Sequence, residues 1–162
     1  MKIELVKSPL LSGSYATIYN VLIDDELTLF DRFVAENVQE NRIELKNILD
    51  KLKTIGCETG ARISHFKENE GSLGDGVCAM FDLPDKKLRL YCIRYGTQII
   101  ILGGGGLKPE DIRAWQDDPK LTLEASLIIK VAKRINKAII KDKDIEFSDD
   151  QMEFEGDLVY ED

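Results

Sequence analysis

The segment Val77–Gly106, VCAMFDLPDKKLRLYCIRYGTQIIILGGGG, contains the strongest strand pattern in the chain. Three runs of mainly apolar, β-branched and aromatic residues are separated by short turn sequences at residues 84–86 and 95–97. Neighbouring strands that are joined by such short turns pair in the antiparallel sense. The segment therefore predicts an antiparallel meander over residues 77–102.

The end of this segment joins a fully apolar run to four glycines. Residues 99–102, IIIL, lack the alternation of a half-buried strand, so we expect a central strand that is covered on both faces. Gly103–Gly106 fit neither the GxxxxGK[ST] nor the GxGxxG spacing of phosphate-binding loops. The glycines are therefore expected either to end the buried strand and turn the chain sharply, or to bring the backbone close to another group.

The residues before the meander predict two strands and two helices. Residues 2–6 and 15–22 are strand-like and predict an N-terminal hairpin or two neighbouring strands. Apolar residues at helical spacing predict helices over about 27–36, with Asp24 and Asp25 at its start, and over about 41–56.

The residues after the glycines predict a helical region and an acidic extension. Pro109 is placed to open a short helix, and a longer helix is expected over about 121–141. The apolar face of the longer helix is expected to hold Leu123, Leu127, Val131, Ile135 and Ala138, with lysines on the opposite face. Residues 142–162 alternate apolar and acidic side chains and predict an acidic extension that either adds an edge strand or packs on the surface of the domain.

The whole chain, residues 1–162, is expected to form one α+β domain: a small antiparallel sheet with helices packed on one face. Hydrophobic residues make up 43% of the chain and charged residues 32%, as in globular proteins. The N-terminal segment lacks the apolar core of a signal peptide, and no window approaches the roughly 20 apolar residues of a membrane span. We therefore expect a cytoplasmic protein that makes no membrane contact.

Charge and cysteine content restrict the chemistry that the chain can support. The formal net charge is −8, so binding to nucleic acid would need a local basic patch. Cys57, Cys78 and Cys92 are widely spaced, and His65 is the single histidine. This pattern fits neither a zinc site nor a disulfide framework, so neither a metal nor a cofactor is predicted.

The middle strand of the meander offers the first candidate site. Arg89 and Tyr91 alternate with apolar residues and should face the same side of the sheet. If that side is exposed, the guanidinium group can bind a phosphate and the ring can stack on an RNA base. The alternative is structural, with Arg89 in an ion pair and Tyr91 packed under a helix. His65, with Arg62 and Lys67 nearby in the sequence, is a weaker acid–base candidate, because a lone histidine on a loop is usually solvated.

The order of these elements resembles the RelE/ParE-type toxins of bacterial toxin–antitoxin systems. The strand residues 88–91, LRLY, are similar to the family's arginine-containing strand motif, and Ile99–Gly103 with Lys108 resemble its apolar strand, glycine turn and lysine. The similarity covers about residues 25–141. It implies a RelE-like fold, a metal-independent endoribonuclease that cuts ribosome-bound messenger RNA, and an antitoxin partner; ParE-like members act instead on DNA gyrase.

The resemblance also assigns roles to residues of this chain. The residues implied to be catalytic are Arg89, Tyr91 and Lys108, and those implied to position RNA are Arg62, His65, Lys67, Lys87 and Arg94. The family's toxins are usually shorter and basic, whereas this chain is acidic and ends in an acidic extension. A second hypothesis is therefore a non-catalytic protein with the same fold that binds a protein partner through the sheet and the acidic extension.

Overall fold

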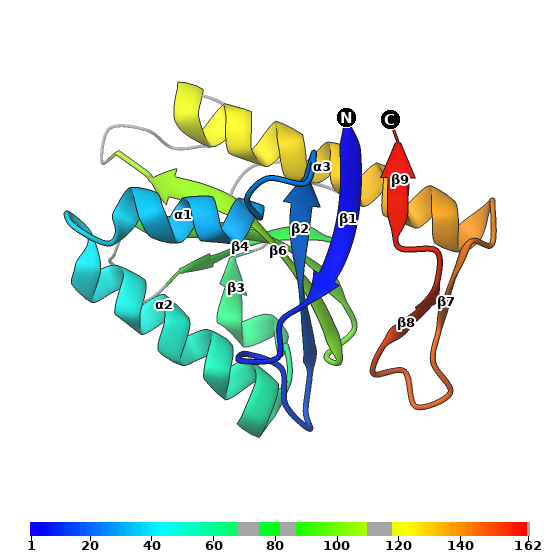
Figure 1. The fold of residues 1–162 in the computed structure, drawn as a ribbon. Coiled ribbons are helices and arrows are strands. Elements are labelled where there is room, and N and C mark those ends of the chain that lie inside the picture. The colour runs from blue at the N-terminus through cyan, green and yellow to red at the C-terminus, as the bar shows by residue number, and fades with distance from the viewer. Residues whose placement is uncertain (68–74, 82–86, 110–117, 162) are drawn as a thin grey trace.

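The computed structural model describes residues 1–67, 75–81, 87–109 and 118–161 (Figure 1). Within these residues, the main sheet has the strand order β3-β4-β5-β6-β2-β1-β9. Its strands are β1 (Lys2–Lys7), β2 (Thr17–Ile23), β3 (Phe66–Lys67), β4 (Val77–Phe81), β5 (Leu88–Tyr95), β6 (Ile99–Leu107) and β9 (Val159–Glu161). β2 and β6 pair in parallel, and the other neighbours are antiparallel. The predicted α+β class, N-terminal hairpin and β4–β5–β6 meander are confirmed.

The helices are α1 (Leu29–Asn37), α2 (Arg42–Thr54) and α3 (Pro119–Ile140). α1 begins later than predicted, because Asp24 and Asp25 have φ angles of 50° and 60° and form a turn. Thr28 caps α1 by accepting a hydrogen bond from the Asp31 backbone N–H, and Asp118 caps α3 in the same way. The short helix expected after Pro109 falls on residues 110–117, outside the described residues.

Helices cover both faces of the sheet, so the prediction that they pack on one face is wrong. α3 lies on one side of the sheet and α1 and α2 lie mainly on the other (Figure 1). One core contains Ile99 and Ile101 with the buried side of α3, and the other contains Ile100 and Leu102 with α1 and α2. Since β6 lies between β5 and β2, residues 99–102 form the central, doubly covered strand that was predicted.

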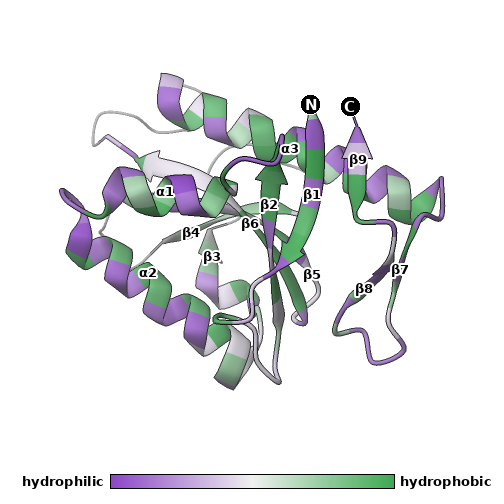
Figure 2. Cartoon of the chain, viewed as in Figure 1, coloured by the Kyte–Doolittle hydropathy of each residue, from purple (hydrophilic) through white to green (hydrophobic). Residues whose placement is uncertain are grey.

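Each helix presents both hydrophilic and hydrophobic residues along its length (Figure 2). The buried side of α3, however, differs from the predicted one at its N-terminal end. Leu121, Ala125 and Ile128 are buried there, whereas Leu123 is 63% exposed. The buried positions keep helical spacing from Leu121 onward, so the apolar side chain of Leu123 falls on the outer surface of the helix.

The four glycines continue β6, so the alternative in which they end the strand is wrong. Gly105 and Gly106 pair with β5, and the register between β5 and β6 shifts by one residue at Gly103 and Gly104. A Cβ atom on Gly103 would lie 3.0 Å from the Ile128 side chain, and one on Gly104 would overlap the Glu124 carboxylate. The glycines therefore allow α3 to approach the strand closely.

The C-terminal extension packs against the rest of the chain. β9 pairs with β1 at the edge of the sheet, and β7 (Ile145–Phe147) and β8 (Phe154–Gly156) form a separate hairpin. The ring of Phe154 lies 5.3 Å from those of Tyr19 and Tyr95, centre to centre, and the Phe154 backbone N–H donates to the Tyr19 hydroxyl. The extension is therefore part of the α3-side core.

Candidate functional site

Arg89 and Tyr91 lie inside the protein. Tyr91 has no exposed surface and belongs to the core that packs against α3. Arg89 is only 4% exposed. The Arg89 Nη1 atom donates to its neighbour's carbonyl, that of Leu88, at 3.3 Å. The alternation that places both residues on one face was correct, but α3 covers that face. Of the two alternatives for this pair, the structural one is therefore borne out for Tyr91, which packs under α3, and the condition for display to an RNA, an exposed face, is not met.

Three of the remaining residues that the resemblance selected lie at opposite ends of β5: Lys87 and Lys108 at one end and Arg94 at the other. Lys87 and Lys108 are adjacent at the start of β5, where the Lys108 N–H donates to the Lys87 carbonyl at 2.8 Å. Arg94 lies at the far end of the strand. Seven residues at about 3.3 Å each separate Lys87 from Arg94 by about 23 Å along the strand. These cations therefore do not form one compact site.

The cluster around His65 is held by interactions within the fold. The Arg94 Nε atom donates to the Ala61 carbonyl at 2.8 Å, and its guanidinium group lies 5.6 Å from the centre of the Phe66 ring. The His65 Nε2 atom lies 3.1 Å from the Thr59 hydroxyl. Burial, with the charges of Lys51, Arg62 and Arg94, lowers the pKa of His65, which favours its neutral form.

Lys67 and Arg62 complete the predicted positioning set. Lys67 pairs with Ala79 in the two-residue edge strand β3, and Arg62 is exposed just before the helical turn Ile63–His65. Neither is brought to the Lys87–Lys108 end of β5 by these pairings. The predicted catalytic and RNA-positioning residues are thus distributed over the core and both ends of the meander.

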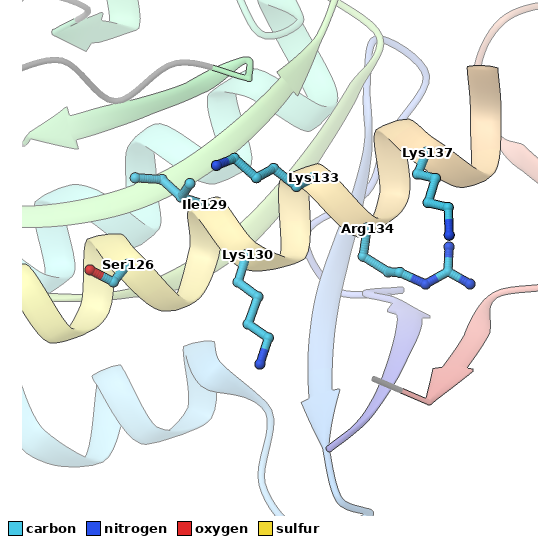
Figure 3. Close-up of a pocket in the computed structure, with 6 residues that line it drawn as sticks. All are labelled: Ser126, Ile129, Lys130, Lys133, Arg134 and Lys137. Atoms are coloured by element: carbon cyan, nitrogen blue, oxygen red, sulfur yellow. The ribbon is translucent and has the colours of Figure 1, made fainter. Parts of the chain in front are cut away.

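A different group of cations shares one surface. Lys130, Lys133, Arg134 and Lys137, here called the α3 basic strip, line a shallow hollow of about 450 Å³ with Ser126 and Ile129 (Figure 3). Lys130, Arg134 and Lys137 project to one side of the helix in this view, and Lys133 projects to the other. Residues 125–141 contain no Asp or Glu, so the strip has no acidic side chain within its own length.

The C-terminal end of the strip is partly neutralised by the extension. The Asp142 carboxylate lies 3.7 Å from Arg134 Nη1 and 3.9 Å from Lys137 Nζ. The Arg134 guanidinium group lies 4.1 Å from the centre of the Tyr160 ring, a cation–π distance. Burial raises the pKa of Tyr160 to about 12, so the ring remains neutral at physiological pH. Arg134 is therefore oriented by its surroundings, whereas Lys137 remains 54% exposed.

The charges in the N-terminal half of α3 are arranged differently. Glu124 is 1% exposed, and both of its oxygens accept from Arg32 Nη2 of α1, at 2.6 and 2.7 Å. Lys120 Nζ donates to Glu124 at 2.8 Å and to Glu36 at 3.1 Å. This buried ion-pair network, Arg32, Glu36, Lys120 and Glu124, joins α1 to α3 beside Gly104. Both carboxylates of the network are ion-paired within the fold, while the Arg32 Nε atom is buried without a hydrogen-bond partner among the described residues.

Lysines were expected on the outer face of this helix, but none of them was among the predicted site residues. The signal that identifies the strip is the run of seventeen residues, 125–141, in which every charged side chain is basic in a chain of net charge −8. This run of basic residues indicates a surface patch only when it is known which face of α3 is exposed.

Among the described residues, no three His, Cys, Asp or Glu side chains lie close enough together to hold a metal ion. Cys78 and Cys92 are buried and Cys57 is exposed, all as free thiols.

No helix in the described part of the chain is long and apolar enough to cross a bilayer. Comparisons of the chain with protein-family models, with curated proteins and with solved structures find no match.

Proposed function

We propose that this chain is a protein-binding module whose α3 basic strip docks a short acidic segment of a partner protein. The observation that carries the proposal is that Lys130, Lys133, Arg134 and Lys137 line one hollow on α3 in an acidic chain. Groups of one charge sign on a surface attract and orient partners of the opposite sign. The proposal keeps the protein-binding hypothesis but moves the contact from the covered sheet to α3.

The length of the strip favours a short partner segment. From Lys130 to Lys137 the helix rises by about 10 Å, at about 1.5 Å per residue. Immediately after α3, residues 144–161 contain acidic side chains and no Lys or Arg. A long polyanion that followed the helix would meet these acids within the screening length of about 8 Å at physiological salt. A few carboxylates, in contrast, match the strip without reaching the extension.

Exposed apolar side chains on the same helix favour a protein over a nucleic acid. Leu123 is 63% exposed and Ile140 is 70% exposed, and they lie on either side of the strip along α3. Protein interfaces combine apolar contacts with arginine and lysine, whereas a phosphate backbone gains little from leucine and isoleucine. The mixed surface therefore suits an amphipathic acidic segment.

A charge-reversal experiment tests the proposal. The Lys133→Glu/Lys137→Glu variant changes the strip, and Lys46→Glu/Lys53→Glu makes the same change of net charge on α2. The probes are a labelled synthetic peptide with leucine and glutamate residues, a neutral peptide of the same length and a single-stranded RNA oligonucleotide. Fluorescence anisotropy should show acidic-peptide binding that weakens at least about tenfold in the strip variant, weakens with salt, and changes much less in the α2 variant.

Three results would contradict the proposal. Equal losses in the two variants would mean that total charge, and not the strip, controls binding. Tighter binding of the RNA than of the acidic peptide would favour a nucleic-acid interface. Failure of the acidic peptide to bind at low salt would remove the main support for an acidic partner.

The second candidate is the metal-independent endoribonuclease implied by the resemblance. It is favoured by the order β2, α1, α2, then the β4–β6 meander and α3, which follows the pattern on which the resemblance rests. The burial of Arg89 and Tyr91 weighs against their direct contact with RNA. Its test is growth arrest on induced expression together with cleavage of ribosome-bound message, compared between wild type and Lys87→Ala/Lys108→Ala. Arg89→Ala is a poor probe, because loss of a buried side chain disturbs the fold.

A further inference from the structure

A small pocket lies between α3, the start of α1 and the loop that precedes α1. Its volume is about 200 Å³, and its apolar walls are formed by Ile23, Leu29 and Leu127. Leu27, also in the lining, is 60% exposed. Pockets for drug-sized ligands usually measure about 300–1,000 Å³. The size and the walls therefore match one large apolar side chain better than a nucleotide or a cofactor.

The charged groups of the pocket define what can enter beside that side chain. Asp24 and Glu26 contribute acidic groups to the lining. Arg32 also lines it, but its charge is already matched by Glu124, whose oxygens lie 2.6 and 2.7 Å from Nη2. The lining thus carries two carboxylates against one guanidinium group that is already ion-paired, although the Arg32 Nε atom is buried without a hydrogen-bond partner in the described part of the chain. An apolar residue with neutral or basic neighbours fits this end of the surface.

The pocket and the α3 basic strip belong to one continuous helix surface. Leu127, in the pocket wall, lies one turn before Lys130, and Arg134 follows one turn further on the same side. Leu127 and Lys137 are separated by about 15 Å along the helix, at about 1.5 Å per residue. The surface therefore changes from apolar with acidic groups to basic over about three helical turns.

We infer that the pocket anchors one large apolar side chain of the acidic segment that docks on the α3 basic strip, with the segment's carboxylates placed one to three helical turns from that anchor. This inference rests on the proposed function, and it specifies the recognised motif: an apolar anchor without adjacent acids, followed by acids over the cations. Charge complementarity along α3 selects this occupant, since a uniformly acidic chain would be repelled by Asp24 and Glu26.

Three synthetic helical peptides of equal length and net charge test the motif. The first has a leucine anchor and glutamates one to three turns away, the second has serine in place of the anchor, and the third has the glutamates adjacent to the leucine. Against wild-type protein, the second and third peptides should bind about tenfold more weakly than the first, the effect expected when a buried apolar side chain is lost or a like charge is introduced.

Two protein variants connect the motif to the pocket. Leu27→Ser changes an exposed lining residue with little risk to folding, and Ile43→Ser is the control, since Ile43 is 78% exposed on α2 outside this surface. Leu27→Ser should weaken binding of the leucine peptide several-fold and leave the serine peptide unchanged. Ile43→Ser should change neither. Circular dichroism and thermal melting confirm that both variants fold.

The outcomes separate this inference from the proposed function. If all three peptides bind equally and Lys133→Glu/Lys137→Glu still abolishes binding, the anchor is overturned and the acidic-partner function stands. If no peptide shows strip-dependent binding, both are overturned. Sedimentation of the protein alone tests the other occupant: concentration-dependent self-association that Leu27→Ser abolishes would assign the pocket to a second copy of the chain and overturn the inference.

Discussion

The two halves of α3 both carry basic side chains, but a carboxylate, Glu124, is present only in the N-terminal half. In the N-terminal half, Glu124 is 1% exposed and is held by Arg32 and Lys120. In the C-terminal half, Lys137 is 54% exposed, and the Asp142 carboxylate lies 3.9 Å from its Nζ atom. The difference follows from the neighbours: α1 and the glycines of β6 surround the first half, whereas the second half faces outward.

This contrast shows that a charge acquires its role from the elements packed around it. A buried ion pair is costly to break, because removing one partner leaves an uncompensated charge in a low-dielectric setting. An exposed lysine contributes little to folding and remains available to a partner. Substitutions in the N-terminal half of α3 should therefore lower the free energy of unfolding, whereas substitutions in the C-terminal half should mainly weaken binding.

Glu124→Ala should give the largest loss of stability. It leaves Arg32 and Lys120 without their shared carboxylate, and we expect the free energy of unfolding to fall by about 3 kcal/mol, since breaking buried pairs typically costs about 3–5 kcal/mol and both cations retain some exposure. The measurement is urea denaturation followed by circular dichroism. Glu36→Ala, at the exposed end of the same network, is the control and should cost less than about 1 kcal/mol. Equal effects of the two changes would contradict the distinction.

Gly104→Ala tests whether close packing of α3 on β6 holds this network in place. Its Cβ atom would overlap the Glu124 carboxylate, so the ion pairs must shift, at an expected cost of about 2 kcal/mol. Gly106→Ala is the control, because its Cβ would lie 3.3 Å from the flexible Lys120 side chain. Denaturation of the Gly104→Ala/Glu124→Ala double variant should show a combined cost well below the sum. If the cost of the double variant equals the sum of the two single costs, the strain caused by Gly104→Ala does not act through Glu124.

The strand pattern correctly predicted the central strands of the sheet. It did not predict which face of each strand is covered, because that depends on how the helices pack. Alternation in residues 88–94 correctly placed Arg89 and Tyr91 on one face. Whether that face is exposed depended on α3, which follows in the sequence and packs back over it. Sequence alternation reports the side of a strand, not what covers that side.

The glycines and Leu123 show the same limit. Gly103–Gly106 have weak strand propensity, yet the close approach of Glu124 and Ile128 makes small residues necessary within β6. Leu123 was assigned to the apolar face because it is apolar, although the buried register of α3 begins at Leu121. The α3 basic strip could not be identified without these two results, because they determine which side of α3 is buried and which side is exposed.

Reversing Lys133 or Lys137 to Glu should change the free energy of unfolding by less than about 0.5 kcal/mol, as is usual for exposed positions. Both side chains are exposed on α3, and the ion pair of Lys137 with Asp142 is long, at 3.9 Å. Urea denaturation of each variant checks this expectation. A loss as large as that of Glu124→Ala would mean that the strip stabilises the fold, and would weaken its assignment as a docking surface.

His65 should produce the smallest effect, and one that depends on pH. Burial and nearby cations lower its pKa in the folded protein below the ordinary value of 6.5, so the unfolded chain binds the proton more readily. The contribution of neutral His65 to stability is therefore complete above about pH 6.5 and is lost as the pH falls below that value, by a few tenths of a kcal/mol at this partly exposed site. Denaturation of wild type and His65→Gln from pH 7 to pH 5 should show a slightly steeper decline in wild type. An identical slope would mean that His65 has the same pKa in the folded and unfolded chain, and that burial and the charges of Lys51, Arg62 and Arg94 do not lower it.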